Sequence, residues 1–142
     1  MSINEFDIEL LKAAINELKT NPNACMEPPA ICSETEFSPL MANFFNYVAW
    51  GLGEAPIDFN ELDGNLDTLR EKFGNIIKKE DVKHYTLGEA FAILCQLHYQ
   101  ERVWSGCIYN EFQSGYLLEL LEHILRLILD LKAQGKIKNK SL

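Results

Sequence analysis

The sequence has few basic residues, no long apolar run and no strand-length alternation of polar and apolar residues, and each absence excludes a class of protein. Its 13 lysines and arginines stand against 21 aspartates and glutamates, which gives a formal net charge of −8. Such a surface repels nucleic acid backbones and anionic membrane surfaces, so we expect direct binding to neither. No uninterrupted apolar stretch approaches the length that a membrane-spanning helix needs.

Paired cysteines at metal-ligand spacing are also absent. The four cysteines (Cys25, Cys32, Cys95 and Cys107) include no two-residue-spaced pair and match no zinc pattern. We therefore expect no structural metal and no cofactor. Thiols that are buried or idle in a reducing compartment are the expected state.

The two ends of the chain differ in charge. Glu5, Asp7 and Glu9 stand where a secretory signal would carry basic residues, so a cytoplasmic location is expected. No acid follows Asp130, whereas four lysines do. We expect one helical domain over residues 1–133 and a basic, flexible tail over residues 134–142.

What is present is helical periodicity. Apolar residues recur every three or four positions in most segments, which predicts an all-α fold: a compact single-domain bundle of about five to six helices. In the last third, two long helices are expected to run antiparallel around a short linking helix. The expected helices cover residues 3–20, 38–50, 67–79, 86–105, 108–112 and 117–131.

Local signals mark several helix ends. Ser38 followed by Pro39 is typical of a helix start, with serine as the cap and proline in the first turn. Thr86 and Glu89 have the spacing of a capping box, the clearest start in the chain. Gly106 is expected to cap the C-terminus of the helix that begins there.

The segment Asn21–Phe37 holds three prolines and few periodic apolar residues. Proline has no backbone N–H group to donate within a helix or a sheet, so we expect this segment to be a surface loop without a strand. Unstructured connections of this length often carry function, so this loop is a candidate contact for a partner.

Two groups of residues are candidate binding sites. The densest polar and aromatic cluster contains Tyr99, Gln100, Glu101, Arg102 and Trp104, and Arg102 lies one turn from His98. In this group Arg102 could bind an anion or a partner, and Trp104 could anchor the partner. The alternative is structural, with Arg102 bonded to helix-end carbonyls or a carboxylate and Trp104 filling the turn. The second group, Asn43, Asn46 and Trp50, could form the polar floor of a pocket, although exposed asparagines are commoner.

The residues that could form a catalytic or metal site also have simpler interpretations. His98, Glu101, Glu119 and His123 could hold a metal between facing helices, but a histidine paired with a glutamate is commoner. Cys95, three residues before His98, is more typical of a small core residue than of a nucleophile. We therefore name no catalytic residue and no metal ligand.

Over Thr86–Ile124 the chain carries Leu87, Phe91, Leu94, Glu101, Arg102, Gly106, Phe112, Gly115, Leu120 and Leu121. The order of these residues resembles a bacterial family of uncharacterised small helical proteins, known as a domain of unknown function. The resemblance covers the last third of the chain. It implies a bacterial or phage setting and a helical fold with an arginine and then a glycine at the junction of two helices, and it transfers no catalytic residue.

These observations favour a non-catalytic, acidic helical protein that binds another protein, one that is itself basic, as immunity proteins, antitoxins and phage inhibitors do. The alternative is a domain that binds a small molecule or is an enzyme, with a pocket near Asn43, Trp50, His98 and Arg102. The last helix carries more apolar surface than one neighbour can cover, so a homodimer through Tyr116–Leu131 is also predicted.

Overall fold

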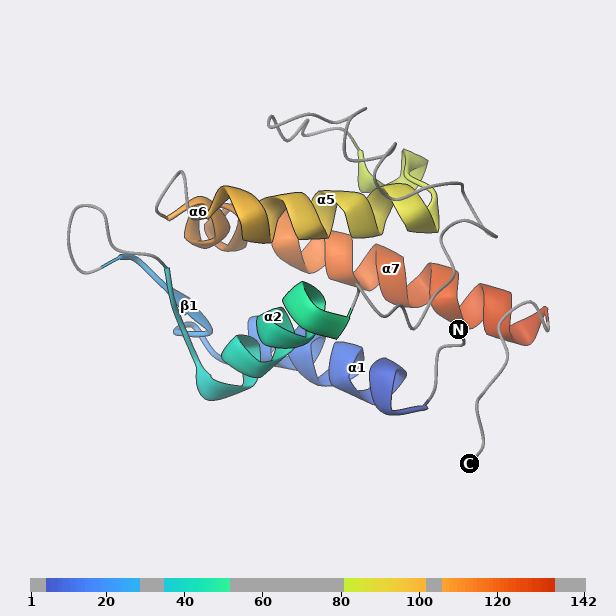
Figure 1. Cartoon of the computed structure of the whole chain (residues 1–142), viewed down its shortest axis with the longest axis horizontal. Helices are drawn as coiled ribbons and strands as arrows, with labels where there is room; N and C mark the ends of the chain where they lie inside the picture. Colours follow the sequence, from blue (N-terminus) through green and yellow to red (C-terminus); the bar gives the residue numbers. More distant parts are fainter. Residues whose placement is uncertain (1–4, 29–34, 52–80, 102–105, 135–142) are drawn as a thin grey trace.

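The computed structural model describes residues 5–28, 35–51, 81–101 and 106–134, and most of these are helical (Figure 1). The prediction of a mostly helical chain is confirmed over these residues. The helix expected at residues 67–79 and the tail from residue 135 onward lie outside them. The elements are α1 (Glu5–Thr20), β1 (Cys25–Met26), β2 (Glu36–Phe37), α2 (Pro39–Gly51), the 3-10 turn η1 (Val82–His84), α5 (Leu87–Gln100), α6 (Cys107–Gln113) and α7 (Tyr116–Ala133).

The helices pack in two pairs. In Figure 1, α5 and α7 lie above α1 and α2, and the short elements β1 and α6 lie together at one end. Helix α7 contacts α1, α5, α6 and η1, whereas α2 contacts α1 and α5. Helices α5 and α7 run in opposite directions, because the chain reverses at α6. Within the described residues, no helix combines the length and the apolar character that crossing a bilayer requires.

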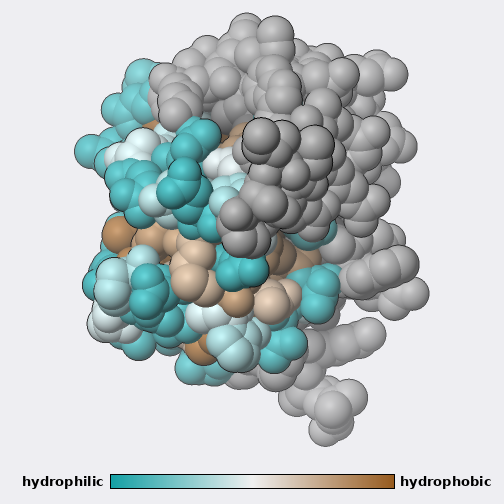
Figure 2. Space-filling view, turned by 90° about the vertical axis from the view of Figure 1, so that its left-hand side faces the viewer, coloured by the Kyte–Doolittle hydropathy of each residue, from teal (hydrophilic) through white to brown (hydrophobic). Residues whose placement is uncertain are grey.

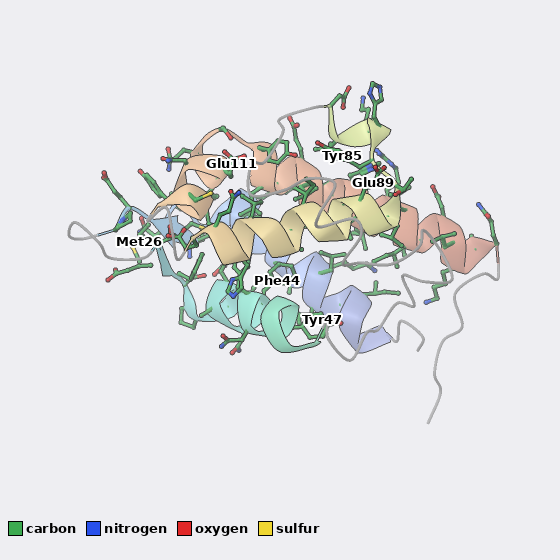
Figure 3. The ribbon with its side chains drawn as sticks, turned by 45° about the horizontal axis from the view of Figure 1, so that its top comes forward. Met26, Phe44, Tyr47, Tyr85, Glu89 and Glu111 are labelled. Atoms are coloured by element: carbon green, nitrogen blue, oxygen red, sulfur yellow. The ribbon has the colours of Figure 1, made fainter. Side chains whose placement is uncertain are left out.

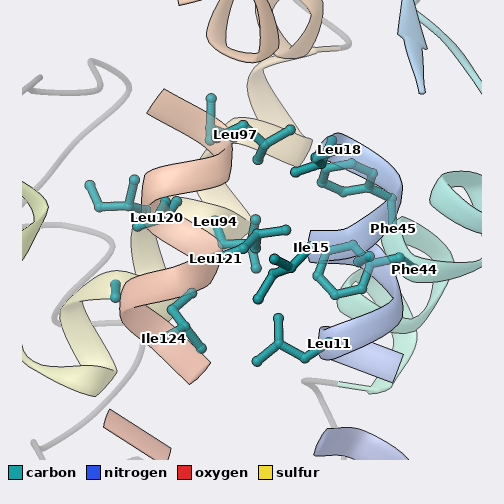
Figure 4. Close-up of a cluster of buried hydrophobic side chains, with 14 of the residues drawn as sticks. Leu11, Ile15, Leu18, Phe44, Phe45, Leu94, Leu97, Leu120, Leu121 and Ile124 are labelled. Carbon is teal, nitrogen blue, oxygen red and sulfur yellow. The ribbon is translucent and has the colours of Figure 1, made fainter. Parts of the chain in front are cut away.

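The apolar stripes of four helices meet in one core (Figure 4). Helical periodicity places these side chains on one face of each helix, and none is more than 7% exposed. Burying a side chain of this size stabilises the fold by about 1.5–3 kcal/mol. The residues are Leu11, Ile15 and Leu18 of α1, Phe44 and Phe45 of α2, Leu94 and Leu97 of α5, and Leu120, Leu121 and Ile124 of α7.

Two of the expected helix starts are confirmed. The Ser38 hydroxyl accepts a hydrogen bond from the Met41 amide at 3.4 Å, at the start of α2. At the start of α5, the Thr86 hydroxyl accepts from the Glu89 amide at 3.2 Å, and the Glu89 carboxylate accepts from the Thr86 amide at 3.1 Å. This reciprocal pair is the capping box that the sequence predicts.

Gly106 has a different role from the expected one. Helix α5 ends at Gln100, and Gly106 is the N-terminal cap residue of α6 instead of the C-terminal cap of α5. Its φ of 87° is left-handed, a conformation that glycine adopts without steric cost. Gly106 is a cap residue, as the sequence predicts, but it caps the N-terminus of α6 and not the C-terminus of α5.

The segment Asn21–Phe37 also departs from expectation, because its two ends form an antiparallel pair of strands. Cys25 lies opposite Phe37, and Met26 lies opposite Glu36. The Phe37 ring packs against Phe45 of α2 with a centroid distance of 5.0 Å, and this tertiary contact fixes the strand that the prolines were expected to exclude. None of the three prolines lies within either strand, so the ladder and the prolines are compatible.

Candidate functional site

A buried carboxylate joins three parts of the chain at the end of the molecule where β1 and α6 lie. Glu101 is 3% exposed and directly follows α5. Its Oε2 atom accepts from the amides of Thr35 (3.1 Å) and Gly106 (2.7 Å). Its Oε1 atom accepts from the Thr35 hydroxyl (2.6 Å) and the Ile108 amide (2.9 Å). We call this group, with Tyr109, the Glu101 junction.

The junction supplies the hydrogen-bond acceptors for the first turn of α6, because α6 has no side-chain cap of its own. A helix leaves its first amides without intrahelical partners, and Gly106 has no side chain to offer them. Glu101 accepts from the Gly106 and Ile108 amides, and the Thr35 hydroxyl accepts from the Tyr109 amide at 3.3 Å while donating to Glu101. The negative carboxylate also lies at the positive end of the helix dipole. Glu101 therefore acts here as a cap supplied from another element.

Cys25 lies inside this end of the molecule and is 1% exposed. Burial, and to a smaller extent the negative charge of Glu101, raises the pKa of its thiol from 9.0 to about 12. A thiol in this state remains protonated and is a poor nucleophile. Cys25 is thus a structural residue in the closed fold.

The structure describes only some of the residues that were predicted to share a pocket. The His98 ring stacks on Phe45 of α2, with a centroid distance of 5.7 Å and an interplanar angle of 8°. Asn43 and Asn46 are exposed. Asn43 is two residues from Phe45, about 200° around the helix, so it points away from His98. Arg102, Trp104 and the side chain of Trp50 lie outside what the structure describes.

His123 has a structural role in α7. It is 3% exposed, and its Nε2 atom donates to the carbonyl oxygen of Tyr85 at 2.8 Å. Its Nδ1 atom accepts from the Arg126 guanidinium, since the carbonyl contact assigns the proton to Nε2. Both ring nitrogens are therefore engaged, and Glu119 on the same helix is exposed. Among the described residues, no group of three or more potential ligands is arranged to hold a metal ion.

The surface near the junction combines apolar and acidic side chains. Figure 2 faces this end and shows an apolar band between hydrophilic areas. Met26 and Phe37 are half-buried, and the acids Glu27 and Glu36 beside them are exposed. In Figure 3, Met26 lies at this end, while Glu89 lies toward the other end of α5. We call the surface of β1, β2 and Glu27 the hairpin end.

The negative charge of the protein lies on the described elements. Of the 21 acidic residues, 13 lie in the described parts of the chain, against 5 of the 13 basic residues. Ion pairs join Lys12 to Glu9 (3.6 Å) and Lys19 to Glu122 (3.1 Å). Five further exposed acids form no ion pair with any residue that the structure describes: Glu27, Glu36, Asp81, Glu119 and Asp130. The helical body is thus strongly acidic.

Sequence reasoning selected Glu101 but missed its partner Thr35, which is 66 residues away. One signal was present. The short helix after Gly106 has no serine, threonine, aspartate or asparagine at its cap position, so its amides required an acceptor from elsewhere. That signal indicates a missing cap, but it cannot identify the residue that supplies it.

No protein-family model matches the chain, and neither a curated protein nor a solved structure matches it. The resemblance described above therefore stays a prediction.

Proposed function

We propose that this chain is a non-catalytic domain that binds a basic protein through its acidic surface. The observation that carries this proposal is the excess of acidic residues on the described helices and strands, which their own cations leave largely unneutralised. A surface of this kind accelerates encounter with a basic partner and rejects acidic ones. The proposal takes the chain to be one compact bundle of five to six helices, in the manner of immunity proteins, antitoxins or phage inhibitors.

Two of the buried titratable residues, Glu101 and His123, favour binding over chemistry. An active site generally presents an acid, base or nucleophile that is free to reach a substrate. Here the Glu101 carboxylate accepts four hydrogen bonds, and both ring nitrogens of His123 are engaged. These groups stabilise the fold and have no lone pair left for a substrate.

The hairpin end is the best-supported contact surface. Glu36 lies next to Met26 across the strand pair, and Glu27 follows Met26 directly, so two acids flank a half-buried apolar side chain. The two acids give this surface a local negative charge, which a cationic partner would complement. Apolar contact surrounded by charge is also the usual anatomy of a protein interface.

The proposal can be tested by capturing partners on the immobilised chain from a lysate of its native host. Bound proteins are eluted with a salt gradient, identified by mass spectrometry and then purified for affinity measurements at 50 and 200 mM NaCl. We expect a basic partner whose affinity falls at least about tenfold over this range, because salt screens exposed charges. An affinity that salt leaves unchanged, or a partner with an acidic surface, contradicts the proposal.

Two charge-matched variants locate the surface. Glu27→Gln with Glu36→Gln removes two charges from the hairpin end, and Glu119→Gln with Asp130→Asn removes two from α7. We expect the first pair to weaken binding several-fold more than the second. Equal weakening would assign the effect to net charge and would exclude the hairpin end as the contact.

Self-association through Tyr116–Leu131 stays a prediction. The fold already buries most apolar side chains of α7, and Leu129, at 39% exposed, is the one large apolar residue of the described chain that is classed as exposed. A light-scattering mass at micromolar concentration distinguishes a dimer from a monomer.

A further inference from the structure

We propose that Glu101 is a buried latch that makes the β1–β2 pair and the first turn of α6 open and close as one cooperative unit. This inference is independent of the proposed function. It concerns how the hairpin end is held, and it rests on hydrogen bonds between described residues.

The first step is that one side chain bonds to both parts. On the strand side, Glu101 accepts from the amide and the hydroxyl of Thr35, the residue before β2. On the helix side, it accepts from the amides of Gly106 and Ile108. The Thr35 hydroxyl also accepts a hydrogen bond from the Tyr109 amide, which links the strand side directly to the helix side. Movement of either part alone therefore breaks bonds that also hold the other.

The second step is that water does not replace these bonds in the closed fold. Glu101 and Thr35 are 3% and 5% exposed, so their groups are shielded from solvent. A buried donor that loses its acceptor retains its full desolvation cost, which is larger than the net gain from an ordinary hydrogen bond. The unit is therefore expected to stay closed with all of these bonds intact, or to open and hydrate all of them together.

The third step is that the unit contains two amides that report on it without touching Glu101. The Ser38 amide donates to the Ala24 carbonyl at 3.0 Å, which ties the two strand segments together. The Asn110 amide donates to the Gly106 carbonyl at 2.9 Å, in the first turn of α6. If Glu101 couples the two sides, hydrogen exchange at both amides follows the same opening event.

The test is amide hydrogen exchange, measured by NMR on the full chain, in wild type and in Glu101→Gln. Glutamine keeps the shape but presents an amide N–H₂ group toward backbone donors. We expect Ser38 and Asn110 to exchange at least about tenfold faster, and by similar factors, in the variant. Faster exchange at Asn110 with an unchanged rate at Ser38 would reduce Glu101 to a cap of α6 and overturn the proposal.

Ile128→Val is the matched control, because it lowers global stability from a buried position in α7 outside the junction. We expect it to leave both rates within about twofold of wild type. If it accelerates both amides as much as Glu101→Gln does, they exchange through global unfolding and no separate unit exists.

Thr35→Val provides a second, milder variant that keeps the carboxylate and removes the hydroxyl link. It also permits a chemical readout: Cys25 is 1% exposed, and its modification by iodoacetamide can be followed by peptide mapping. Because the charge of Glu101 is retained, faster modification reports opening of the fold around the thiol, which hydrates it and moves its pKa back toward 9.0. We expect faster modification together with faster exchange at Ser38 and Asn110, and unchanged rates for all three would overturn the proposal even if Glu101→Gln does not fold.

Discussion

The apolar interface of α1, α2, α5 and α7 and the Glu101 junction hold the same molecule together by different means. The apolar interface spreads its stabilisation over many side chains, each of which can be replaced by another of similar size and hydrophobicity. The junction concentrates four hydrogen bonds from two other chain segments on one carboxylate. The difference teaches that hydrophobic burial gives this domain its stability, whereas the position of its hairpin end depends on a few directional bonds.

The largest effect is expected from truncation within the apolar interface. Leu120 of α7 is fully buried, so Leu120→Ala should lower the free energy of unfolding by about 2–5 kcal/mol, from lost burial and the cavity left behind. Urea unfolding followed by circular dichroism measures this change. The same substitution at the exposed Leu129 is the control and should cost less than about 1 kcal/mol.

The helices could be predicted from the sequence and the Glu101 junction could not, because the first depend on local spacing and the second on contacts between distant segments. Repeats such as Ile8, Leu11, Ile15 and Leu18 lie within one helix, so their common face can be predicted from spacing alone. The capping box of α5 is equally local. The bond from Thr35 to Glu101 depends on how distant segments pack, and no local pattern encodes it. For the same reason, the strand pair and the role of Gly106 could not be predicted.

The second prediction concerns pH and uses Cys25, a β1 residue that is buried in the core at the hairpin end. Its pKa is raised from 9.0 to about 12 by burial and then by the charge of Glu101, so the folded state holds the proton more tightly than the unfolded state. The stabilising effect is complete below pH 9.0 and is lost between pH 9.0 and about 12. In that window the unfolded state binds fewer protons, so the free energy of unfolding should fall by about 1.4 kcal/mol per pH unit.

Cys25→Ala isolates this contribution, because tyrosines and lysines titrate in the same range. The stability difference between wild type and the variant should be constant from pH 7 to 8.5 and should shrink by about 1 kcal/mol at pH 10. Urea unfolding at each pH measures it. A difference that stays the same at pH 10 would show that the thiol is solvated in the folded protein.

The smallest effect should come from changing the capping box of α5, which is formed by residues close together in the sequence. Thr86 and Glu89 cap α5 through bonds between residues three apart on the surface, whereas Glu101 caps α6 from a buried position outside that helix. Thr86→Ala should lower the free energy of unfolding by about 1 kcal/mol, and Thr86→Ser, which keeps the hydroxyl, by less. Amide exchange should rise only in the first turn of α5, because water can reach the freed donors there without any other segment moving. A rise at Ser38 or Asn110 as well would mean that opening spreads through the whole helical core, and the distinction between a local cap and a coupling latch would then be lost.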